Sequence, residues 1–245
     1  MKRILLVALV VLSAAACKKI TPETRIAQID QHFNGKEAVY SAKLPQYTDE
    51  KLLDYLTLQL AGELGAKDIW TLEEDGQVAL VAEYPGKEKK NTQITMISAP
   101  LSDPNACATL LEMLEAYKKI KIQHNNNIRA IFYSPASDST GVNGLTLVNQ
   151  DIRESGDMVL FDIEVATRDD QPLHTFVLDE SPFFAKTIID VVPGYLAPLG
   201  EYQVVQGVFP NLDWQLRCPI YRYHVDPSAF QQETAAVTAF TFLLN

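Results

Sequence analysis

The sequence has few of the features that mark disulfide-rich, nucleic-acid-binding or membrane-spanning proteins. Its 245 residues include only three cysteines, which leave room for one disulfide at most. Its 21 basic residues are outnumbered by 31 acidic ones, and the formal net charge of −10 disfavours nucleic acid and anionic membrane faces as partners. The apolar run Ile4–Leu12 is far shorter than the roughly 20 residues that a spanning helix needs. The chain has no repeat, and its length is ample for one buried core.

The first 17 residues resemble a bacterial lipoprotein signal. A basic start, an apolar core and a run of small residues lead up to Cys17. Lipidation of Cys17 is the favoured interpretation, and an ordinary secretory signal cut after Ala16 is the alternative. Both export the protein. We therefore expect a signal peptide over residues 1–16, a tether over residues 17–24, and a lipid-anchored place in the bacterial cell envelope, facing the periplasm or at the outer membrane.

The remaining cysteines are Cys107 and Cys218. An exported protein reaches a compartment that permits a disulfide between them. The sequence does not show whether they lie close together, so a bridge and two buried free thiols remain as alternatives.

Apolar periodicity predicts one α/β domain over residues 25–245. Within Thr92–Val148, a β-branched run, a segment of helical spacing, a second apolar run and a second helical segment follow one another. This order predicts a βαβ unit and a three-layer α/β/α fold with a central mixed, mostly parallel twisted sheet. Upstream, Asp49–Leu64 has helical spacing, while Lys67–Glu73 and Gln77–Tyr84 flank an Asp-Gly turn and predict a hairpin.

In open sheets of this kind, ligands bind at the carboxyl ends of the strands. We expect those ends at Pro100, Pro135 and Asp162. Asp162 interrupts an apolar, buried strand, and a buried carboxylate is costly unless it has a partner. It is therefore either a site residue or one half of a structural pair. Asp138, in the loop after the second apolar run, either caps the next helix or belongs to the site.

Five short strings of the chain occur in the order of a known set of motifs. They are Ile97–Ser102 in the place of Gly-Ala-His-x-Asp, Asp103–Ala106 in the place of Asp-Asp-Asn-Ala, Asp138–Gly144 in the place of Glu-Glu-x-Gly-Leu-x-Gly, Leu160–Asp162 in the place of a strand with an Asp, and Tyr223-His224 in the place of a Tyr-His pair. In this order they resemble the M28 family of zinc aminopeptidases and glutaminyl-cyclase relatives, over about residues 48–245.

The resemblance implies that most metal ligands of that family are missing here. In the family, five side chains hold two zinc ions. Pro100 stands at the position of the first His, Pro104 at the bridging Asp and Ser139 at a Glu ligand. Asp162 and His224 match the two ligands that remain.

The resemblance also assigns the other positions of the former site. The general-base Glu corresponds to Asp138, and Asp103 takes the bridging place if the alignment shifts by one residue. We call Asp103, Ser139, Asp162 and His224 the remnant cleft.

From these observations we expect a lipid-anchored envelope protein whose M28-like domain is a non-catalytic binding or scaffold module. Its ligand would be a peptide or a protein, no nucleic acid would bind, and no metal cofactor would be needed. The alternative is an M28-type metallohydrolase, an aminopeptidase or a glutaminyl-cyclase-like enzyme, which acts on peptides with a rearranged or single-zinc site.

Overall fold

A computed structural model describes most of the chain. It covers residues 20–47, 49–87, 92–135, 143–167, 174–178, 190–200, 202–206 and 220–244. The predicted signal peptide over residues 1–16, Cys17 and Cys218 lie outside these stretches. Within them, every helix is too short or too polar to cross a membrane.

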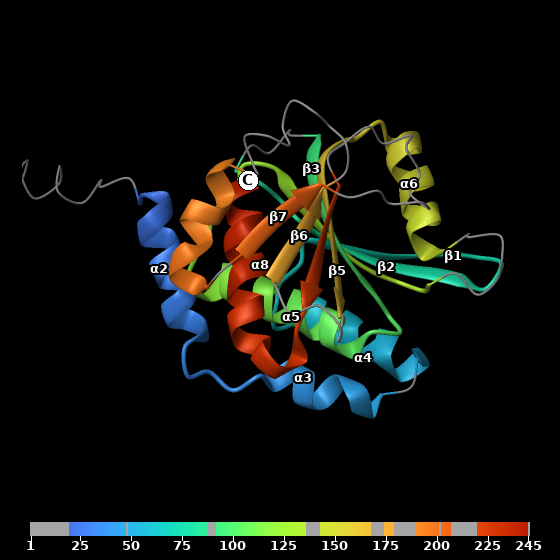
Figure 1. Ribbon diagram of the computed structural model, residues 1–245. Coiled ribbons are helices and arrows are strands. Elements are labelled where there is room, and N and C mark those ends of the chain that lie inside the picture. Colours follow the sequence, from blue (N-terminus) through green and yellow to red (C-terminus); the bar gives the residue numbers. More distant parts are fainter. Residues whose placement is uncertain are drawn as a thin grey trace, which may run out of the picture.

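The described strands form one mixed sheet in the order β1-β2-β4-β3-β5-β8-β6-β7 (Figure 1). The central strands β4, β3, β5 and β8 are mutually parallel, and so are β6 and β7. β1, β2 and the β6–β7 pair are attached in antiparallel fashion. The strand bounds are β1 Asp68–Glu74, β2 Gln77–Tyr84, β3 Gln93–Pro100, β4 Asn127–Tyr133, β5 Met158–Thr167, β6 His174–Leu178, β7 Tyr202–Gln206 and β8 Ile220–Val225.

Helices cover both faces of this sheet (Figure 1). α4, α5 and α8 pack on one face, with α2 against α8 and α3 against α5, while α6 packs on β1, β2 and β4 from the other side. A separate cluster of buried apolar side chains lies on each face. The predicted three-layer α/β/α fold is confirmed. The helix bounds are α2 Pro22–Phe33, α3 Val39–Lys43, α4 Asp49–Ala61, α5 Pro104–Lys119, α6 Gly144–Ser155 and α8 Phe230–Leu244, and residues 190–196 are also helical.

Gly144 sets the close approach of α6 to the sheet. A Cβ atom at this position would lie 2.2 Å from the carbonyl oxygen of Val78, so no larger residue fits without a shift of the backbone. The preceding residue, Asn143, caps α6 by accepting a hydrogen bond from the amide of Thr146. The N-cap of this helix is therefore Asn143 and not Asp138, which lies outside the described residues.

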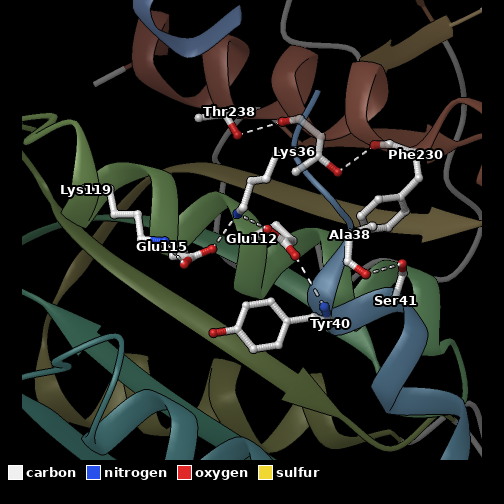
Figure 2. Close-up of polar contacts among 10 residues, drawn as sticks. Lys36, Ala38, Tyr40, Ser41, Glu112, Glu115, Lys119, Phe230 and Thr238 are labelled. Carbon is white, nitrogen blue, oxygen red and sulfur yellow. Dashed lines mark hydrogen bonds and ion pairs between the residues drawn. The ribbon is translucent and has the colours of Figure 1, made fainter. Parts of the chain in front are cut away.

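A buried ion-pair network fastens the segment after α2 to α5 (Figure 2). Lys36 Nζ donates to the carboxylates of Glu112 and Glu115. Glu112 is completely buried, and its other oxygen accepts the backbone N–H of Tyr40 at 3.3 Å. Lys119 pairs with Glu115 from the exposed side. The segment that crosses α5 is thus held by charge as well as by apolar packing.

Candidate functional site

Asp103 links the start of α5 to the carboxyl end of β5. Its Oδ1 accepts hydrogen bonds from the Ala106 amide at 3.0 Å and from the Thr167 hydroxyl at 2.7 Å. Its Oδ2 accepts the backbone N–H of Thr167 at 2.6 Å. Both carboxylate oxygens are therefore bonded to groups of the protein, and the side chain acts as a clamp at the predicted cleft.

Replacing Asp103 with alanine should cost more stability than the loss of an ordinary helix cap. We expect Asp103→Ala to lower the free energy of unfolding by about 2–3 kcal/mol, since both the cap and the charge-assisted bonds to Thr167 are lost. The matched control is Asn143→Ala, which removes a cap alone and should cost about 1 kcal/mol. Urea unfolding of both variants measures the difference, and equal losses would show that the link to Thr167 adds nothing.

Asp162 lies in the middle of β5, and the expectation that it marks the carboxyl end of the strand is wrong. The strand continues because its pairing with β8 extends to Thr167 and Val225. Asp162 is only 6% exposed, and its Oδ1 has no hydrogen-bond partner among the described residues. Burial, with a smaller contribution from Glu164, raises the pKa of this carboxyl from 3.8 to about 7.

A second acidic residue, Glu164, lies two positions further along the same face of β5, and the sequence analysis missed it. Its Oε1 accepts a hydrogen bond from the Tyr133 hydroxyl at 2.9 Å, and its Oε2 accepts one from Arg222 Nε at 2.7 Å. Side chains two residues apart in a strand share a face, so the spacing of the two acids was the signal that could have found this cluster. The cluster thus contains Glu164, which is ion-paired with Arg222, and the buried Asp162, whose Oδ1 has no hydrogen-bond partner in the described part of the chain.

His224 lies in β8, in register with Ala166 of β5, whereas Asp162 is in register with Ile220. The two positions of the remnant cleft are therefore separated by about 13 Å along the strands, at about 3.3 Å per residue. The ion pair of Glu164 and Arg222 lies between these levels. The other two predicted positions, Asp138 and Ser139, lie outside the described residues.

Cys107 is a free, buried thiol at the start of α5. Its Sγ donates to the carbonyl oxygen of Pro100 at 3.3 Å. Burial, with a contribution from Asp103, raises the pKa of this thiol, so it is a poor nucleophile. Of the two alternatives, the free thiol holds for Cys107.

Searches with the sequence find neither a matching family model nor a matching curated protein. Solved structures do resemble the fold. A putative Zn-dependent exopeptidase from Bacteroides vulgatus matches with a TM-score of 0.61 and 13% identity, over 92% of this chain and 97% of that chain. LapB from Legionella pneumophila matches with a TM-score of 0.59 and 14% identity, over 92% and 75% of the two chains.

A further match is the Peptidase M28 precursor from Shewanella amazonensis, with a TM-score of 0.53 and 14% identity over 68% of this chain. The chain spans 44% of that protein, less than half of its length. The chain has a zinc-exopeptidase-like fold. At these identities the likeness establishes the fold alone, so the chemistry of the site depends on the residues themselves.

Three described positions of this zinc-exopeptidase-like fold offer no free ligand for a metal ion. Among the described residues there is no group of three or more His, Cys, Asp or Glu side chains placed to hold a metal. Pro100 ends β3 and Pro104 begins α5, and proline has no side-chain donor atom. Asp103 has both oxygens engaged by the protein. A bridging carboxylate needs its oxygens free for two cations, and none of these three positions offers that.

Proposed function

We propose that the chain is a cell-envelope lipoprotein whose zinc-exopeptidase-like domain binds a peptide or protein without hydrolysing it. The observation that carries this proposal is the state of Asp103, the nearest acid to the bridging position. Its carboxylate fastens α5 to β5 and is flanked by Pro100 and Pro104 where ligands would be expected. In such a domain the fold is kept, but the carboxylate oxygens that could bind a metal accept hydrogen bonds from the protein itself. The domain is then suited to recognition and not to metal-assisted hydrolysis.

The nature of the ligand is proposed from the fold. One structural neighbour, at 14% identity, is named an aminopeptidase, LapA from Legionella pneumophila. Peptides or extended protein segments are accordingly the ligands that the surface at the carboxyl ends of β3, β4, β5 and β8 would accept. The lipid at Cys17 would hold this surface at a membrane of the envelope.

Metal analysis of the purified chain tests the proposal. After dialysis against zinc and then against buffer, we expect far less than one zinc per chain, and no release of amino acids from test peptides. His224→Ala and Asp162→Asn should leave both results unchanged. A stoichiometric zinc that is lost on His224→Ala, together with peptide cleavage, would overturn the proposal in favour of the metallohydrolase.

A further inference from the structure

A cavity of about 610 Å³ opens between α2 and the end of α5. Its lining includes Ile20, Arg25, Gln28, His32 and Lys121, and no described Asp or Glu contributes to it. This is unexpected in a chain with a net charge of −10. The volume lies within the range of small-molecule sites. α5 starts at the carboxyl end of β3 and runs back toward the ends at which the parallel strands begin. The cavity at the end of α5 therefore lies on the opposite side of the molecule from the carboxyl ends of the strands, where the remnant cleft was predicted.

Arg25 is the most buried cation in the lining, at 8% exposure. Its guanidinium makes one hydrogen bond to a described residue, from Nη1 to the carbonyl oxygen of Ile120 at 2.8 Å, and no ion pair with a described carboxylate. A guanidinium carries five N–H donors, so most of them remain available. A cation this buried is costly without a counter-charge, and a bound anion would supply one.

Lys121 is the second cation of the lining, and its backbone has an unfavourable conformation. Its φ is 54°, in the left-handed region, where a helix normally ends on glycine. The hydrogen bond from the Ile122 amide to the Tyr117 carbonyl at 2.9 Å closes the helix end around it. Lys121 is exposed and makes no ion pair with a carboxylate in the described part of the chain. A lysine thus occupies a position where glycine would be less strained.

The neighbouring lysines are already neutralised. Lys36 and Lys119 are bonded to Glu112 and Glu115, as Figure 2 shows, and do not compete for an anion. Two uncharged atoms of the lining are buried without a partner among the described residues, Gln28 Oε1 and His32 Nε2. Burial, assisted by Lys36, lowers the pKa of His32, which keeps it neutral and able to accept a hydrogen bond.

We propose that this cavity binds a phosphate ester, with Arg25 and Lys121 on the phosphate and Gln28 and His32 on hydroxyl groups of the esterified alcohol. A phosphate carries a charge of about −1.5 to −2, which matches two cations that form no ion pair with a described carboxylate. The planar fork of arginine is well suited to phosphate oxygens. The ester group could belong to a lipid headgroup or to a soluble compound, because both present the same chemistry.

Calorimetric titration of the full chain with glycerol 1-phosphate tests the site. We expect saturable binding, weakened about tenfold or more by Lys121→Gly and by Arg25→Gln. Lys121→Gly is the decisive variant, because relief of the left-handed strain should leave the melting temperature unchanged or higher while affinity falls. The control is Lys51→Gln, which removes the same charge at an exposed position of α4 and should bind as the parent does. No saturable binding, or equal affinities for Lys121→Gly and the control, overturns the proposal.

A second measurement identifies the source of the phosphate. The chain is mixed with nanodiscs of phosphatidylcholine, with or without phosphatidic acid, and amide hydrogen exchange is followed over residues 118–123. Protection that requires phosphatidic acid and is lost in Lys121→Gly supports a headgroup ligand. Binding of glycerol 1-phosphate without such protection supports a soluble ester. These results do not depend on metal or peptide binding at the remnant cleft. The phosphate site can therefore be disproved while the proposed function stands, and the reverse.

Discussion

Lys36→Met should lower the free energy of unfolding by about 3–5 kcal/mol, because it leaves the carboxylate of Glu112 buried without a cation. Glu112 is fully buried, and Lys36 is the cation that pairs with it in the described structure. The segment between α2 and α3 would also lose its charged attachment to α5 (Figure 2). Guanidinium unfolding followed by far-UV circular dichroism measures the loss.

The double variant Lys36→Met, Glu112→Gln should recover most of that loss. A neutral glutamine can still accept the Tyr40 N–H, and no buried charge remains. Lys119→Met is the control, because its pair with Glu115 is exposed and should be worth less than about 0.5 kcal/mol. If the two changes simply add, or if Lys36→Met costs no more than Lys119→Met, the buried pair does not stabilise the fold as described.

Asp162→Asn should stabilise the protein in alkaline solution and hardly change it in mild acid. In the fold the pKa of Asp162 is about 7, against 3.8 ordinarily, because of burial and then of Glu164. The folded chain therefore keeps a proton that the unfolded chain releases, and stability falls as pH rises from about 4 to about 7. Asparagine has no charge to bury, so at about pH 8 the variant should be more stable by the order of 2–4 kcal/mol.

Urea unfolding at several pH values measures this effect. Part of the pH dependence should remain in Asp162→Asn, because burial also raises the pKa of Glu233 to about 7. Asp54→Asn, on the exposed side of α4, is the control and should follow the parent curve. If the free energy of unfolding of Asp162→Asn changes with pH just as that of the parent does, from mild acid to mild alkali, Asp162 is not held neutral in the fold. A confirmed penalty would identify Asp162 as a residue kept at the expense of stability, as site residues often are.

Local sequence patterns predicted many of the helices and strands. The Asp-Gly pair predicted the β1–β2 hairpin, and both Asp75 and Gly76 have the positive φ that such a turn requires. Within Thr92–Val148, the first apolar run predicted β3, the segment of helical spacing predicted α5 and the second apolar run predicted β4. The order of the strands could not be predicted, because β8 pairs with β5 across a separation of some sixty residues, and pairing over such distances leaves no local sequence pattern.

The site was less accessible to sequence reasoning for the same reason. The burial of Asp162 follows from the apolar residues around it, which the sequence displays. The bonds of Asp103 to Thr167 join residues 64 positions apart, so its structural role was not visible. Pro100 and Pro104 were informative because proline excludes a side-chain ligand in any conformation.

The place of β8 in the sheet has a consequence for how the protein is made. β8 lies between β5 and β6, so β6 and β7 cannot join the sheet before Ile220–Val225 has left the ribosome. Until then the nascent chain presents an unpaired edge at β5, with Asp162 on it, and such edges invite pairing with other chains. A chaperone that shields this edge during synthesis would act at the stage when the protein is most prone to aggregate.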